Sequence, residues 1–242
     1  RGLYMEPKAF AVGLRIEHPQ SMINMDLYGE EENEFLGAAA YKVTHKCENG
    51  RGVYSFCMCP GGYVVASSSE EETVVTNGMS EYARDGENAN AALVVSVDAS
   101  DFGSGVLDGV AFQRRLEHQA FVLGGKDYRA PAQSVKSYLE AAAPDLSQAA
   151  TAPSFSCGVR EADLHSLFPQ PINRMLEQGL RRFNRRLPGF ADADAVMTGV
   201  ETRTSSPVRI TRDAQSFQAL GMQGLYPCGE GAGYAGGIMS AA

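Results

Sequence analysis

The chain has 242 residues, of which 44% are hydrophobic and 21% charged, and its formal net charge is −8. This length and composition allow one large globular domain or two small ones with a substantial core. The negative charge argues against a general nucleic-acid or anionic-membrane binder, and no apolar run approaches the roughly 20 residues of a membrane-spanning helix.

The first hundred residues are predicted to be rich in β-strands. Period-two alternation places Val12, Leu14 and Ile16 on one face of a strand over residues 9–16. Further strands are expected over residues 41–46, 52–59, 62–68, 71–76 and 91–97. The last of these is nearly all apolar, which predicts a strand that is buried on both faces.

Two turn signals divide these strands. Pro60-Gly61-Gly62 predicts a turn, so residues 52–68 are expected to form a hairpin. Asn77-Gly78 predicts a second turn, directly after the strand over 71–76.

The apolar spacing becomes helical from residue 106. A helix is predicted over 106–123, ended by Gly124-Gly125, and a second over 173–187, ended by Pro188-Gly189. A basic run within the second helix, made of Arg181, Arg182, Arg185 and Arg186, is expected to be a solvated face. Residues 141–153 are expected to be a surface loop, and strands return over 196–201 and 207–212.

Strands followed by helices and then strands indicate an α+β fold. We expect a mostly antiparallel or mixed β-sheet, or a barrel, with a helical subdomain. Along the chain, residues 1–105 form a β-rich region, 106–190 a helical subdomain, and 191–242 the returning strands and a final segment.

The final segment, residues 224–242, is rich in glycine and contains Gly229-Glu230-Gly231 between a strand-like and a helix-like run. Glycines between a strand and a helix allow backbone N–H groups to approach an anionic ligand, and the helix N-terminus favours negative charge. A carboxylate such as Glu230 can accept hydrogen bonds from sugar hydroxyls. The chain also begins at Arg1 and ends as this helix begins, so both ends predict a piece of a longer protein.

This segment resembles the second flavin-contact motif of FAD-dependent oxidoreductases of the two-dinucleotide-binding type. More narrowly, the chain resembles an uncharacterised bacterial family of FAD-dependent dehydrogenases. The resemblance covers nearly the whole chain and is carried by residues 10–20, 56–62, 76–80, 130–133, 201–210 and 224–238.

The resemblance assigns Glu230 to the ribityl or nearby hydroxyls of FAD, although the broader superfamily has Asp at this position. Backbone contacts near the pyrophosphate and flavin ring are implied for Gly229, Gly231, Gly233, Gly236 and Gly237. A strand near the isoalloxazine is implied for Arg203, Ser205, Ser206, Pro207 and Val208.

One part of the family pattern is missing. Such flavoproteins carry a Gly-x-Gly-x-x-Gly phosphate loop in an N-terminal βαβ unit, and the nearest match here, Gly103-Ser104-Gly105, has its third glycine misplaced at Gly109. The chain is therefore expected to lack the Rossmann-type FAD domain that would partner it within one protein. We expect FAD in the intact protein and weak or no FAD binding by these residues alone.

Cys57, Cys59 and Asn77 are the candidate catalytic residues. The two cysteines share one face of a predicted strand before a turn that could present a thiol to a flavin. Asn77 could hydrogen-bond a substrate or flavin edge. The alternative is that the cysteines are small core residues and that Asn77 only forms a turn.

Other chemistry has less support in the sequence. The five cysteines, Cys47, Cys57, Cys59, Cys157 and Cys228, are odd in number and scattered, which favours a reducing cytoplasm over a disulfide framework. No metal site is expected, because there is no second cysteine pair and no histidine pair at ligand spacing. The four histidines form no nucleophile–base pair and are expected to be surface or packing residues.

The sequence thus predicts the substrate-side domain of a cytoplasmic FAD-dependent oxidoreductase acting on a small molecule, inactive as this piece alone. The alternative is a non-enzymatic module that binds a ligand or partner, with the terminal glycines serving a structural role.

Overall fold

The structure is a computed structural model that describes residues 2–147, 149–192 and 195–235. The chain forms two compact units. Unit 1 contains Arg1–Val12, Ser96–Arg115 and Arg203–Ala242, and unit 2 contains Gly13–Val95 and Leu116–Thr202. The three-region division predicted from the sequence stays a prediction.

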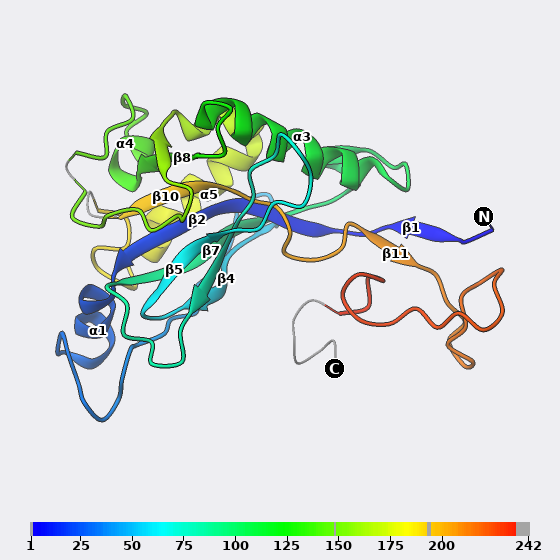
Figure 1. The fold of residues 1–242 in the computed structure, drawn as a ribbon, viewed down its shortest axis with the longest axis horizontal. Coiled ribbons are helices and arrows are strands. Elements are labelled where there is room, and N and C mark those ends of the chain that lie inside the picture. Colours follow the sequence, from blue (N-terminus) through cyan, green and yellow to red (C-terminus); the bar gives the residue numbers. More distant parts are fainter. Residues whose placement is uncertain (1, 148, 193–194, 236–242) are drawn as a thin grey trace. The chain divides into compact units, whose positions relative to one another are not determined.

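The main element is a seven-stranded sheet, which confirms the α+β prediction (Figure 1). Its strands, in spatial order, are β3 (Thr44–Lys46), β4 (Gly52–Cys59), β7 (Asn88–Val97), β2 (Phe10–Pro19), β10 (Val196–Glu201), β8 (Ala130–Ser134) and β9 (Val159–Glu161). β10 pairs antiparallel with both β2 and β8, whereas β8 and β9 are parallel. The sheet is mixed and open, so the described residues form no closed barrel.

Helices cover one face of this sheet in unit 2. The elements are α4 (Val135–Leu139), the 3₁₀ helix η1 (Leu164–Leu167) and α5 (Gln170–Phe183), whereas α1 (Gln20–Tyr28) directly follows the end of β2. α5 packs on β3 and β4, and η1 on β8 and β10. Helix and strand approach closely at Gly179, where a Cβ would lie 2.7 Å from a methyl of Val53. The inner face of α5 buries residues at helical spacing, including Ile172, Leu176 and Leu180.

A second, two-stranded sheet covers the opposite face. It pairs β5 (Gly62–Ala66) with β6 (Thr76–Ser80), and β6 contacts β4 and β10. Side chains alternate along β2, so Arg15 points to the face opposite Leu14 and Ile16. Gly78 of β6 lies against Arg15, whereas Leu14 and Leu167 of η1 lie together beside Gly199. The unit is therefore layered as helices, main sheet and small sheet.

A turn forms at Pro60-Gly61 as predicted, but the hairpin predicted around it is wrong, and so is the turn predicted at Asn77-Gly78. β4 and β5 do not form a hairpin, because β4 pairs with β3 and β7 and β5 pairs with β6. Pro60-Gly61-Gly62 instead passes the chain from one sheet to the other. Asn77-Gly78 lies within β6, and residues 71–75 are not a strand. Glycine is needed at 78 because a Cβ there would lie 1.7 Å from Nη2 of Arg15.

Both long helices are present, as α5 and as α3 (Asp108–Gly124), which ends before Gly125 at φ 104°. The predicted end of the second helix is wrong, because α5 ends at Phe183, before Pro188-Gly189. β7 is buried as predicted, with seven of its first eight residues fully buried and only Asn88 half-buried. The sequence reading omitted α1, α4, β8 and β9, which are short or lack a clear apolar period.

Unit 1 contains a small sheet of its own. β1 (Met5–Pro7) pairs antiparallel with β11 (Val208–Ile210). Phe10, Phe102 and Phe112 form an aromatic cluster, with ring centroids of Phe10 and Phe102 5.2 Å apart. The short helix α2 (Ala99–Phe102) begins with a capping box made by Asp98 and Asp101.

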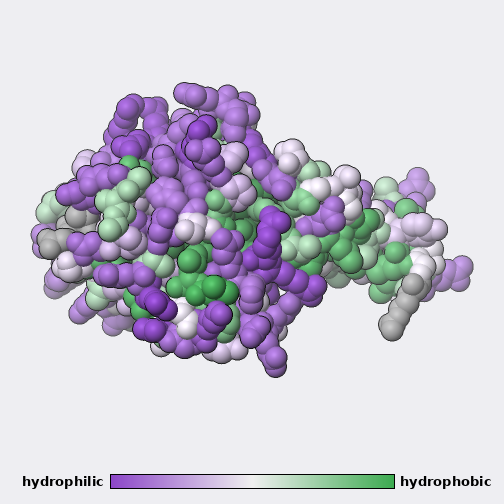
Figure 2. Space-filling model, turned by 90° about the horizontal axis from the view of Figure 1, so that it is seen from above, coloured by the Kyte–Doolittle hydropathy of each residue, from purple (hydrophilic) through white to green (hydrophobic). Residues whose placement is uncertain are grey.

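Most of the face drawn in Figure 2 is hydrophilic, with hydrophobic surface confined to smaller areas. In the part of the chain that the structure describes, no helix is long and apolar enough to span a membrane.

Candidate functional site

A charged residue, Arg15, lies fully buried between the two sheets of unit 2. The alternation of β2 that buries Leu14 and Ile16 toward the helices directs Arg15 toward β6. Its Nε donates to Oδ1 of Asn90 at 2.9 Å, and its Nη2 donates to the carbonyl oxygen of Cys57 at 3.2 Å. Buried charges are rare unless paired, so the groups around Arg15 require attention.

The carboxylate nearest to Arg15 belongs to Glu201, the last residue of β10. Oε1 of Glu201 lies 3.6 Å from Nη1 of Arg15, and Thr76 Oγ1 donates to Oε2 at 3.3 Å. Burial raises the pKa of Glu201 to about 7, because loss of solvation outweighs the attraction of Arg15 and the Thr76 hydrogen bond. This carboxyl can therefore gain or lose a proton near neutral pH.

The polar layer, defined as Arg15, Thr76, Asn90 and Glu201, is incompletely hydrogen-bonded. Among the described residues, Arg15 Nη1 and Asn90 Nδ2 are buried without a hydrogen-bond partner. Native proteins leave few such groups, because each costs about 1–3 kcal/mol. These unpaired groups therefore lower the stability of the folded protein. Such a cost is typical of residues that are maintained for function.

The predicted candidates Cys57 and Cys59 border this layer. A bulge between Phe56 and Cys59 interrupts the β4–β7 pairing, and Cys57 has a φ of 44°. Cys59 Sγ lies 3.7 Å from Nη2 of Arg15. Burial raises the pKa of the Cys59 thiol, and Arg15 only partly opposes this, so the thiol form is favoured.

Asn77 lies in β6 opposite Val65, and its Oδ1 accepts a hydrogen bond from the N–H of Gly78 at 2.7 Å. Its neighbour Gly78, rather than Asn77 itself, contacts Arg15. The sequence reading missed Arg15, Glu201, Thr76 and Asn90 as site residues. The available signal was Arg15 itself, a charge between the apolar residues Leu14 and Ile16 of one strand.

The predicted flavin-contact residues lie in unit 1, around β11. Ser206 Oγ donates to the carbonyl oxygen of Val208 at 2.8 Å, and the N–H of Lys8 donates to the carbonyl oxygen of Pro207 at 2.9 Å. The N–H of Ile210 donates to the carbonyl oxygen of Ala232 at 3.1 Å. The glycine-rich segment is thus held against β11.

The glycines of this segment differ in their surroundings. Gly229 and Gly231 have open space where a Cβ would be, so their backbone is accessible to a ligand. At Gly233 a Cβ would lie 2.5 Å from the carbonyl oxygen of Val208, so this glycine serves close packing. Gly236 and Gly237 lie outside the described residues.

Cationic groups lie in the same unit. Arg212 stacks on the ring of Tyr234, with Cζ 3.7 Å from its centroid, and Arg209 lies over the same ring at 5.5 Å. Burial and the charge of Arg209 lower the pKa of Lys8, and Glu230 opposes this effect. An open glycine backbone, a carboxylate and nearby cations fit the hydroxyl- and phosphate-bearing part of a dinucleotide cofactor.

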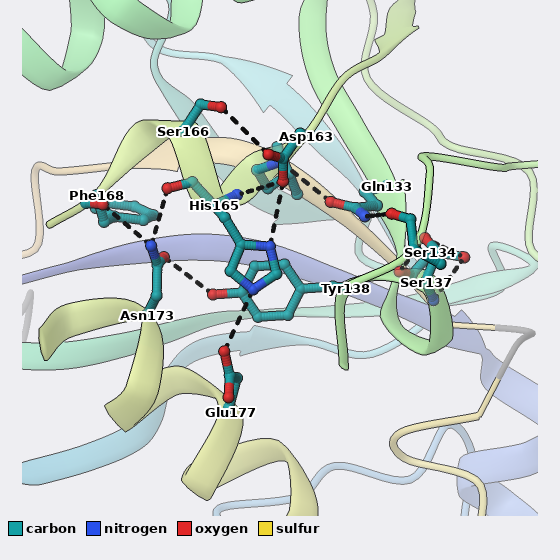
Figure 3. A network of polar contacts seen from close by, with 12 residues as sticks. Gln133, Ser134, Ser137, Tyr138, Asp163, His165, Ser166, Phe168, Asn173 and Glu177 are labelled. Carbon is teal, nitrogen blue, oxygen red and sulfur yellow. Dashed lines mark hydrogen bonds and ion pairs between the residues drawn. The ribbon is translucent and has the colours of Figure 1, made fainter. Parts of the chain in front are cut away.

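A second polar network in unit 2 surrounds His165 (Figure 3). The imidazole stacks on Tyr138, with centroids 3.9 Å apart, and its ring nitrogens lie 3.2 Å from Asp163 and 3.3 Å from Glu177. Asn173 accepts from Tyr138 Oη and donates to the carbonyl oxygens of His165 and Phe168. These contacts join η1, α4 and α5, so this network stabilises the helical layer.

His18, unlike the partly exposed His165, is fully buried. It packs against Phe190 and Tyr41, and its Nε2 lies 3.0 Å from the carbonyl oxygen of Phe190. Burial lowers the pKa of His18 to about 4, so it is neutral at physiological pH. Its surroundings are those of a packing residue. Across the described residues, no group of three or more His, Cys, Asp or Glu side chains is placed to hold a metal ion.

Comparison with known proteins shows the family to which the chain belongs. The family model for the C-terminal domain-like region of FAD-dependent proteins matches residues 9–204, and the chain belongs to this family. An uncharacterised protein of Clostridium beijerinckii is 49% identical over 242 residues, covering 98% of this chain. The match covers 45% of that protein, so the chain spans less than half the length of this relative.

Proposed function

We propose that the chain is the substrate-side domain of an FAD-dependent oxidoreductase, a bacterial dehydrogenase that acts on a small molecule in the cytoplasm. Membership in a family of FAD-dependent proteins carries the proposal. The five cysteines are all free, in keeping with a reducing compartment. A Rossmann-type FAD domain in the same protein would supply the rest of the cofactor site, as the length of the Clostridium relative allows.

Within this proposal, specific residues hold the cofactor. The backbone at Gly229 and Gly231 binds it closely, because no side chain or neighbouring atom fills the space beside them. Glu230 would accept hydrogen bonds from the cofactor's hydroxyls, and Ser206 and Pro207 would contact its flavin part. Bound FAD supplies the hydride chemistry, and the protein orients it and excludes water.

The polar layer contributes proton chemistry. Glu201 holds a proton on its carboxyl group near neutral pH, because burial raises its pKa to about 7. Arg15 and Thr76 fix the two oxygens of this carboxyl. Cys59 remains a neutral thiol beside Arg15 and shields the layer on the β4 side.

FAD titration tests whether the cofactor site is divided between this chain and a separate Rossmann-type domain. We expect a longer protein that includes both halves to bind FAD tightly, whereas the 242-residue chain binds it weakly or not at all. Quenching of flavin fluorescence measures both affinities. A micromolar or tighter complex with the 242-residue chain would contradict the division of the site.

A further inference from the structure

A cavity of about 760 Å³ lies beside α4 and α5, away from the polar layer and sharing no residue with the flavin-contact segment. Its lining includes Lys136, Glu140, Arg181, Asn184, Arg185 and Asp192. This volume is in the range of pockets that hold small molecules, which is roughly 300–1,000 Å³.

Three cations line the cavity, one from α4, one from the last turn of α5 and one from the turn that follows α5. Lys136 comes from α4, whereas Arg181 lies near the end of α5 and Arg185 one turn further on. The apolar face of α5 buries Leu180 and Phe183, so these arginines lie on its outer side. The basic run was predicted to be a solvated face. Two of its four arginines, Arg181 and Arg185, line this cavity.

Two carboxylates, Glu140 and Asp192, share the cavity lining with these cations. Arg181 Nη2 donates to the carbonyl oxygen of Leu139 at 2.9 Å, a neutral partner. Within residues 2–147, 149–192 and 195–235, no ion pair joins Lys136, Arg181 or Arg185 to a carboxylate. Arg181 lies in the last turn of α5 and Arg185 follows the end of the helix, so an anion bound between them would reduce the repulsion of their charges.

The rim of the cavity is fixed by hydrogen bonds. Asn184 Oδ1 accepts from the N–H of Ala191 at 2.9 Å, which closes the segment that follows α5. The bond from Arg181 to Leu139 ties α5 to the end of α4. The cations are therefore presented on a defined frame.

We propose that this cavity binds a small molecule that carries a phosphate or diphosphate group. Arginine guanidinium groups bind phosphate oxygens with paired hydrogen bonds, and Lys136 adds a point charge. Glu140 and Asp192 also line the cavity, so the remainder of the ligand presents hydroxyl or amine donors to these carboxylates. The same carboxylates would repel an extended polyanion.

Calorimetric titration with pyrophosphate, at constant ionic strength and on a full-length protein that includes this chain, tests the proposal. We expect saturable binding that weakens at least tenfold in the Arg181→Gln/Arg185→Gln double variant. The Lys136 side chain makes no hydrogen bond to a described residue, so its removal should not disturb the fold. The Lys136→Gln variant should weaken binding about threefold or more. Arg174→Gln is the matched control, because Arg174 is exposed on the same helix outside the cavity lining.

Circular dichroism checks that each variant is folded, and Lys136→Gln decides the test if the double variant is not. Absence of saturable pyrophosphate binding would overturn the proposal. Equal weakening in Arg174→Gln would also overturn it, because the effect would then reflect overall charge rather than this cavity.

Discussion

At the residue scale, the polar layer holds a carboxyl and a guanidinium 3.6 Å apart, a distance too long for a hydrogen bond. Neither charge is fully compensated. Burial disfavours the ionised form of Glu201, and this raises the pKa of its carboxyl. His18, on the other face of β2, shows the reverse effect, since burial lowers its pKa. The two groups therefore predict opposite dependences of stability on pH.

Glu201 should make the protein less stable as pH rises. Its pKa is about 7 in the folded state and 4.5 in an unfolded chain, so the folded state binds more protons between these values. The contribution is complete below pH 4.5 and is lost through pH 7, about 3 kcal/mol in all. Glu201→Gln should abolish this fall, as measured by urea unfolding at pH 5 and pH 8. Glu117→Gln, at another buried carboxyl, should keep the wild-type fall.

His18 should make the protein less stable as pH falls. Its pKa is about 4 in the folded state and 6.5 in an unfolded chain, so the unfolded state binds more protons between these values. The contribution is complete above pH 6.5 and about 3 kcal/mol is lost on approaching pH 4. His18→Gln should remove this acid sensitivity in urea unfolding across pH 4–7. An unchanged slope, or the same change in His45→Gln, would show that another group is responsible.

At the element scale, β6 can lie against β2 and β7 only because residue 78 is glycine. A Cβ there would lie 1.7 Å from Arg15 Nη2 and 2.2 Å from Asn90 Oδ1. The close approach positions Thr76 beside Glu201, so strand packing and the polar layer depend on one another.

Gly78→Ala should therefore lower the free energy of unfolding by about 1–3 kcal/mol, through overpacking of the polar layer. Gly231→Ala is the control, since its Cβ would meet no atom within 4 Å and it should change stability by less than about 0.5 kcal/mol. Chemical denaturation measures both. Equal stability of the two variants would mean that β6 shifts without cost.

Sequence patterns predicted the elements with long apolar periods, namely α3, α5 and β7. They could not show that Pro60-Gly61-Gly62 joins two different sheets, because a turn motif does not specify which strands pair. The same limit applies to the site. Cys57 and Cys59 were identified locally, whereas Arg15 and Glu201 meet only because β2 pairs with β10, far along the chain.

At the scale of the whole molecule, the chain belongs to a family of FAD-dependent proteins and spans less than half of its Clostridium relative. Each of its two units holds a different part of the proposed chemistry. The polar layer lies in unit 2 and the flavin-contact segment in unit 1. The central claim is that both serve one flavin-dependent enzyme.

The absorbance spectrum of a purified full-length protein that includes this chain tests this claim most directly. Expressed with ample riboflavin, the protein should be yellow, with flavin absorbance that denaturation releases as FAD in about one equivalent. A colourless full-length protein that takes up no FAD would contradict the claim and favour a non-enzymatic binding module.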